Sequence, residues 1–235
     1  MSGFLLKGGL IEFTESFPIP IPNVIIFQYN PETMTHAWTP SAPASDAKGA
    51  NPIALIGQPK ETFSFTLVMD SNDTIADGNP VIAGIAELSG VYTRLAALEM
   101  LMFPTAPPGG VLIGSVTAAL GIGGGSSSPT PTQQVPAGQL PIVLFVWGPG
   151  RIVPVRVQTL SFTEKLYDAT LLNPTHVEAQ ISLQVLTQDE LTALKDTLLG
   201  GLANTAYGYT QTLREALALA NLANAASSII GMLPV

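Results

Sequence analysis

The chain has 235 residues, of which 9 are Lys or Arg and 17 are Asp or Glu, so its formal net charge is −8. Only 11% of the residues are charged, whereas globular domains usually carry about 25%. The absence of cysteine excludes a disulfide scaffold, a thiol nucleophile and Cys-ligated metal sites. The acidic balance argues against nucleic-acid binding, which requires a basic surface. So few charges indicate that part of the surface is buried against other chains.

Signals for export or membrane insertion are weak. The first thirteen residues lack the basic region, the apolar run and the cleavage site of a signal peptide, so we expect assembly in the cytoplasm. Two stretches, 100–150 and 216–235, carry no charge. Pro and Gly interrupt the first too often for an apolar helix of about 20 residues. The second is rich in Ala and Asn, and we expect a helix buried on protein, with membrane attachment as an alternative.

The N-terminal part predicts two strands and a loop. Residues 10–16 alternate loosely between apolar and polar side chains, which is typical of a strand. Residues 23–29 form a continuous β-branched and aromatic run, which predicts a strand buried on both faces. Residues 31–59 contain five prolines and little periodicity, so we expect a long loop there.

A regular strand and a helix are expected next. Residues 60–70 alternate strictly, with Phe and aliphatic side chains at 63, 65, 67 and 69 on one face. Residues 71–80 have turn chemistry, and Asn79 with Pro80 then predicts a helix start. The helix is expected over 81–103, followed by Pro104. Its apolar stripe is Ile85, Leu88, Tyr92, Leu95, Leu98 and Met102.

The second half begins with an uncharged excursion, 104–140, which is rich in Gly, Pro, Ser and Thr. A β-hairpin is then expected from 141–147 and 151–164, because two apolar runs flank Gly-Pro-Gly. The apolar phase changes between Val157 and Leu160, which predicts a bulge or a bend. We expect a loop at 165–173 and an alternating strand at 177–185.

The C-terminal part predicts two helices. Thr187 and Glu190 have the spacing of a capping box that opens a helix running to about Leu199. Gly200 and Gly201 are expected to close it, and a second helix is expected over 210–230. The fold class is therefore mainly β with flanking helices (α+β). The expected arrangement is two packed antiparallel sheets or a small barrel, one helix on the sheet and a helical C-terminal tail.

Patterns for catalysis or metal binding are missing. His36 and His176 have no partner histidine at metal-ligand spacing, and we expect both in loops. The stretch 70–78 superficially has the spacing of a calcium loop but lacks its glycine and its closing Glu. The sequence has no phosphate loop and no nucleophile elbow. We therefore expect no enzymatic activity, no metal and no cofactor.

Several short motifs resemble one known family. Residues 27–32, Phe-Gln-Tyr-Asn-Pro-Glu, resemble a segment near the start of tube and baseplate proteins of contractile injection systems, which are phage-tail-like particles. Residues 63–70 and the helix after them resemble the next part of that family. Residues 141–148, which end in Trp-Gly, resemble a later strand, and the return strand to 164 and the strand 177–186 complete the order. The resemblance covers about residues 10–190.

The resemblance implies a tail-tube fold in a hexameric ring with no catalysis. It implies a tube initiator, which joins the inner tube protein on one side to the spike or other baseplate proteins on the other. It also implies a tail-tube-like domain at 1–199 and an Ala-rich helical extension at 200–235 in place of the family's LysM module. The residues expected to act as core or inter-subunit anchors are Phe27, Tyr29, Asn30, Pro31, Phe63, Phe65, Phe145, Trp147, Gly148 and Phe162.

Independent physical reasoning also favours a ring. Strands that are apolar on both faces need cover on both sides, and a closed ring supplies it by continuing one sheet edge onto the next. A bulk inner-tube subunit is one alternative. A monomeric β-barrel that binds a lipid or small molecule is another, because the chain is apolar.

Overall fold

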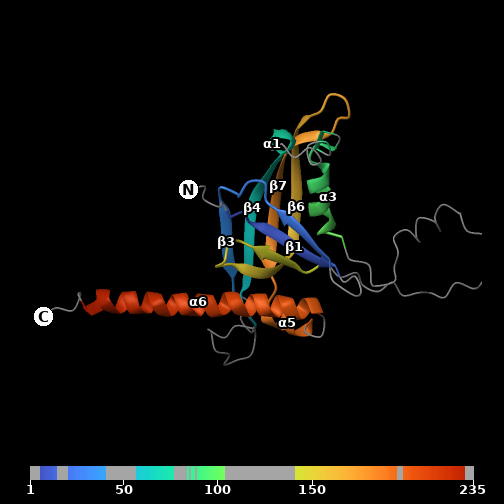
Figure 1. Cartoon of the computed structure of the whole chain (residues 1–235). Coiled ribbons are helices and arrows are strands. Elements are labelled where there is room, and N and C mark those ends of the chain that lie inside the picture. The colour runs from blue at the N-terminus through green and yellow to red at the C-terminus, as the bar shows by residue number, and fades with distance from the viewer. Residues whose placement is uncertain are drawn as a thin grey trace, which may run out of the picture.

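The computed structural model describes most of the chain apart from 104–140 and several shorter segments. The described residues are 6–14, 21–40, 57–76, 84, 86–87, 89–103, 141–194 and 198–230. The excursion at 104–140, the helix start at 79–80 and the tail after 230 therefore lie outside the described residues. The described part is mainly β with flanking helices (Figure 1), as expected from the sequence.

In the described part of the chain, seven strands form one hydrogen-bonded sheet in the order β2-β1-β5-β6-β7-β4-β3, and every neighbouring pair is antiparallel. The strands are β1 (Gly9–Thr14), β2 (Ile21–Ile26), β3 (Met34–Thr39), β4 (Lys60–Asp70), β5 (Val143–Val146), β6 (Ile152–Tyr167) and β7 (Pro174–Val185).

The sheet curls so that its two ends face each other. In the strand order β5 is three places away from β4, which in a flat sheet would separate them by about 14 Å. The ring centroid of Phe145 on β5 nevertheless lies 5.3 Å from that of Phe63 and 5.6 Å from that of Phe65, both on β4. β1 and β5 therefore cross in front of β4, β7 and β6 (Figure 1), and the core lies between them.

β4 has the bounds and the faces that the sequence predicts. Its buried apolar residues are Phe63, Phe65, Leu67 and Met69, and they alternate with half-buried polar and aliphatic positions. The expected hairpin of β5 and β6 is also present, and three of the four residues of β5 are buried. Burial of β5 on both faces is therefore confirmed.

A bulge in β6 accounts for the phase change in its sequence. The pairing with β7 skips Gln158, because Val157 pairs with Leu183 and Thr159 pairs with Ser182. Before the bulge β6 pairs with both β5 and β7, and after it only with β7. β6 extends to Tyr167 and β7 begins at Pro174, so the loop expected at 165–173 is shorter.

The helix expected at 81–103 is interrupted. The helix α3 (Tyr92–Met100) follows a turn at Gly90, where φ is +57°. A Cβ at Gly90 would lie 2.4 Å from the carbonyl oxygen of Pro174, so the turn needs glycine. Leu95 and Leu98 are buried as expected, whereas Tyr92 is exposed. The turn expected at 71–80 begins instead with a short helix, α1 (Ser71–Ala76).

The C-terminal helices also differ from expectation. The capping box of Thr187 and Glu190 is present and starts α5 (Gln188–Ala193), which ends earlier than predicted. α6 (Leu198–Ile230) then runs through Gly200 and Gly201, so these glycines do not close a helix. Packing of Ala203 against Leu186 and Leu191 accounts for this early start, because it gives the first turns of α6 a buried face.

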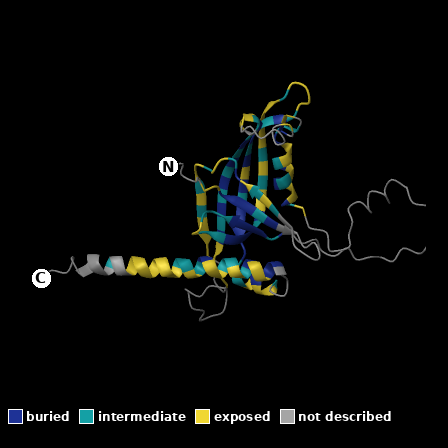
Figure 2. Cartoon of the chain, in the orientation of Figure 1, coloured by how far each residue is buried: buried dark blue, intermediate teal, exposed yellow. Residues whose placement is uncertain are grey.

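Two further expectations were wrong. β2 is not buried on both faces: Val24 is 50% exposed and Ile26 is 63% exposed, because β2 ends the sheet and pairs only with β1. The loop expected at 31–59 contains β3, which pairs with β4 along its whole length. Figure 2 shows the burial of the core between the strands and the exposure of much of α6.

We expect the substitution Phe145→Ala to lower the free energy of unfolding by about 3–5 kcal/mol, the usual cost of truncating a buried aromatic side chain. Phe145 is fully buried and contacts both Phe63 and Phe65. Chemical denaturation measures the change. Phe103→Ala is the control, since Phe103 is 58% exposed, and an equal loss in both variants would contradict the curled core.

Candidate functional site

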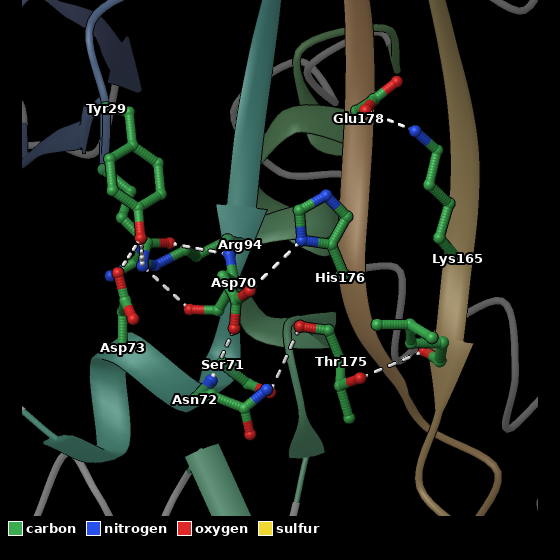
Figure 3. A network of polar contacts seen from close by, with 12 residues as sticks. Tyr29, Asp70, Ser71, Asn72, Asp73, Arg94, Lys165, Thr175, His176 and Glu178 are labelled. Carbon is green, nitrogen blue, oxygen red and sulfur yellow. Dashed lines mark hydrogen bonds and ion pairs between the residues drawn. The ribbon is translucent and has the colours of Figure 1, made fainter.

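The outer face of β4, β6 and β7 carries small polar side chains. Thr62, Ser64 and Thr66 alternate with the buried residues of β4. The register places Ser64 opposite Ser182, and the Ser64 hydroxyl donates a hydrogen bond of 3.2 Å to the Ser182 hydroxyl. Lys165 on β6 forms an ion pair with Glu178 on β7 (Figure 3). One side of the sheet is therefore suited to water and not to a second apolar layer.

Besides the outer edge of β2, two strand edges are open among the described residues. The N–H and C=O groups of Asp70 face the Gln28 side chain, away from β7. Because the backbone direction alternates along a strand, the register of β4, β7 and β6 turns the backbone groups of Leu160, Phe162 and Glu164 outward. No described strand pairs with this edge of β6 or with the outer edge of β3. Unpaired edges favour the addition of another strand.

The tip that joins β6 to β7 is apolar and exposed. Leu166 is 68% exposed and Leu172 is 70% exposed, and Tyr167 and Leu171 beside them are also exposed. Leu166 and Leu172 also have φ values of 49° and 56°, a region that disfavours leucine. Strained and exposed leucines do not help the isolated chain, so they indicate a contact surface.

The segment 27–32 is hydrogen-bonded to the C-terminal end of β4. The Gln28 amide donates to the Asp70 carbonyl at 2.8 Å and accepts from the Asp70 N–H at 3.0 Å, as a paired strand would. Arg94 of α3 donates a hydrogen bond to the same Gln28 oxygen. Figure 3 shows Arg94 and Tyr29 converging beside Asp70. Asn30 secures the N-terminal segment, because its side chain accepts from the Gly8 N–H and donates to the Leu6 carbonyl, each at 2.9 Å.

Ionisable side chains in this region are joined by hydrogen bonds that shift the pKa values of Asp70 and Tyr29. His176 Nδ1 lies 3.1 Å from Asp70 Oδ2. Burial alone would raise the pKa of Asp70, but the hydrogen bonds from His176 and the Asn72 N–H outweigh it and lower that pKa. Tyr29 donates a hydrogen bond to Asp73, and this bond raises the pKa of Tyr29 to about 12. The arrangement ties the segment 27–32, β4, α1 and β7 together.

A second polar cluster lies where α6 meets the sheet. Glu61 of β4 is buried, and Arg214 of α6 binds both its carboxylate oxygens, with one distance of 2.9 Å. His36 Nε2 lies 2.7 Å from the same carboxylate, while the His36 ring stacks on Phe63. Burial lowers the pKa of His36 and outweighs the opposing hydrogen bond with Glu61. The expectation of loop histidines was wrong, because His36 lies on β3 and His176 on β7.

The structure separates the ten predicted anchors into two groups. The core holds Phe27, Phe63, Phe65 and Phe145, and Trp147 and Phe162 pack against it while half-buried. Tyr29 and Asn30 are exposed but hydrogen-bonded, and Pro31 is half-buried. Gly148 has a φ of +70°, which the turn between β5 and β6 requires. A role of any of them between subunits stays a prediction.

Sequence reasoning missed the residues that join distant segments: Gln28, Asp70, Glu61, Thr210 and Arg214. Glu61 and Arg214 are 153 positions apart, and no local pattern connects them. The only signal was a Glu in phase with the apolar residues of β4.

The described residues contain no group of three or more His, Cys, Asp or Glu side chains that could hold a metal ion. No helix among them is long and apolar enough to cross a membrane. No protein-family model matches the chain, and no curated protein matches it. The open edges, the polar face and the apolar tip are therefore the candidate functional surfaces.

We expect the stability of the fold to fall as the pH drops below 6.5, the ordinary pKa of histidine. Because the folded state lowers the pKa of His36, the unfolded chain binds more protons between the two pKa values. Glu61, Arg151, Arg214, Trp38 and Phe63 face this ring. The variant His36→Gln should show a flatter dependence of the unfolding free energy on pH. The control variant His176→Gln should keep the part of this pH dependence that comes from His36. An unchanged slope in His36→Gln would contradict this assignment.

We expect Arg214→Met to lower the free energy of unfolding by about 2 kcal/mol or more, since it leaves the buried Glu61 carboxylate with one partner fewer. Chemical denaturation measures this loss. The double variant Arg214→Met with Glu61→Gln should recover part of it. No recovery would show that the arginine acts through packing and not through the carboxylate.

Proposed function

We propose that this chain is a structural ring subunit of a contractile injection particle and that it connects the inner tube to the spike in the baseplate. The observation that carries the proposal is the sheet of β6, β7, β4 and β3, which has a small-polar outer face and an open strand at each side. No feature of the described residues requires a substrate. The motifs at 27–32, 63–70 and 141–148 give the proposal its particular family.

Copies of the chain join edge to edge in this proposal. β6 and β3 run in opposite directions, because each neighbouring pair from β6 through β7 and β4 to β3 is antiparallel. The β6 edge of one copy therefore continues antiparallel into the β3 edge of the next. The tilt of strands in a closed barrel accommodates the offset between β3, near one end of the sheet, and the free part of β6 at the other. Repetition of this contact closes a ring, which we expect to be hexameric.

The polar face then lines the channel, and the core lies outside it. Small hydroxyl and amide side chains give a wall that binds cargo weakly. The contact of Phe145 with Phe63 supports the finer interpretation of two packed layers, in which β1, β2 and β5 form the outer one. The apolar tip at Leu166 and Leu172 contacts an axial neighbour, which is the tube protein or the spike.

Two alternatives remain distinct from this proposal. A bulk inner-tube subunit would use the same edges but stack on itself through the tip. A monomeric carrier of a small apolar ligand is favoured by one observation, a cavity of about 180 Å³ between β2, β4 and α3. Its lining includes Val24, Ile26, Met69 and Leu98, with Gln28 and Arg94 as polar groups.

The edge contact is tested by Glu164→Pro. Proline at this exposed position removes an outward N–H and leaves the ladder with β7 intact, and such edge positions tolerate proline. We expect the wild type to form closed rings by mass photometry and negative-stain microscopy. Glu164→Pro should be monomeric with an unchanged circular dichroism spectrum.

Glu164→Ala is the matched control, because it removes the same side chain and keeps the N–H, and it should still form rings. A wild-type chain that stays monomeric at high concentration, and binds neither a tube nor a spike protein, would overturn the proposed function. Rings in Glu164→Pro would show that a different edge closes the assembly.

A further inference from the structure

The first half of α6 is fixed to the sheet by specific polar contacts. The buried Thr210 hydroxyl donates to the Ile152 carbonyl at 2.7 Å and accepts from the Ile152 N–H at 3.3 Å. The Tyr209 hydroxyl donates to the Pro149 carbonyl at 2.8 Å, and Arg214 binds Glu61 as described above. These contacts set the direction of the helix.

The second half of α6, from Glu215 to Ile230, extends beyond the sheet. Figure 1 shows it leaving the body past β3, on the side away from α3, and Figure 2 shows that its part up to Leu222 is exposed. Leu217, Leu219 and Leu222 are 62%, 67% and 63% exposed. Its 16 positions correspond to about 24 Å of helix. None of the contacts described above reaches past Arg214.

The composition of this half is unsuited to water. After Glu215 it contains no charged residue, and most of its positions are Ala or Leu. At 100° per residue, Leu217 falls on the same side as Thr210, while Leu219 falls on the opposite side. Asn221, Asn224 and Ser228 fall on the Thr210 side, whereas Leu219 and Leu222 are exposed on the other side. Clustered exposed leucines indicate a contact surface, and an isolated helix of this length is marginal in water. The exposed half therefore requires a partner.

A second copy of the chain is the partner that the geometry favours. α6 leaves the body on the side of the open β3 edge, which is where the proposed function seats the next copy. The chain carries a net charge of −8, so copies approach with least repulsion where a surface has no charge. A membrane is the less favoured partner, because no described helix is long and apolar enough to span one.

We propose that the second half of α6 docks on the adjacent copy of this chain in the ring, beyond the β3 edge. This inference rests on the proposed function, since it names the contact that accompanies edge pairing. α6 then links neighbouring subunits around the base of the ring, and its fixed first half presents it in a single direction.

The lack of cysteine makes the contact directly testable. Leu219→Cys provides the only thiol in the full chain, and it is labelled with benzophenone maleimide and irradiated in the purified protein. We expect cross-linked products at multiples of the chain mass, with peptides of this chain on both sides of the link. Thr192→Cys, on the exposed side of α5, is the matched control and should give none.

A second variant tests the energetic role of the contact. Replacing Leu217, Leu219 and Leu222 together by Gln keeps a helix-forming side chain at exposed positions, so the body should keep its melting temperature. We expect the ring to dissociate at a protein concentration at least tenfold higher than the wild type.

The outcomes separate the two proposals. Rings without cross-links from Leu219→Cys would overturn the docking of α6 and leave the ring intact as a proposal. Monomers without cross-links would overturn both. Binding of the wild type to neutral lipid vesicles that is lost in the Gln variant, with no cross-links between copies, would overturn docking on a second copy in favour of a lipid surface.

Discussion

The contact of Phe145 with Phe63 and Phe65 is the constraint on which the rest of the structure depends. It brings the two ends of one antiparallel sheet face to face and thereby creates an interior for a chain with few charges. Once the sheet is curled, α3 covers the core with Leu95 and Leu98. Among the described residues, no apolar layer covers the opposite face of β4, β6 and β7. The polar face and the open edges are consequences of how this core is closed.

Polar contacts add to the aromatic core at the two opposite ends of the strands. At one end the Gln28 amide pairs with the backbone of Asp70 where no strand follows. At the other end, the Thr210 hydroxyl forms hydrogen bonds with both the N–H and the carbonyl of Ile152, beyond the end of β7. In each case one side chain substitutes for a missing strand residue. This is how the fold satisfies buried backbone groups at the places where its sheet stops.

The parts of the fold that were predictable are those with a strong local pattern. Apolar and polar residues alternate along β4 without a break, and the change in apolar phase around Gln158 predicted the bulge in β6. β3 was not predictable, because the flanking Pro31 and Pro40 and its polar residues hid the alternation of Met34, His36 and Trp38. β2 has the apolar run of a central strand but lies at an edge, and only topology decides between these. The cluster around Glu61 joins residues far apart in sequence, so no periodicity could reveal it.

The uninterrupted path of β6 has a mechanical consequence. A single strand of 16 residues begins beside Thr210 of α6 and ends at the tip with Leu166, and it pairs with β7 from Val155 to Tyr167. A force that pulls on the tip along this strand acts on many ladder hydrogen bonds in shear and at the same time, instead of opening them one after another. The strand that carries the exposed apolar tip can thus transmit tension to the base of the molecule.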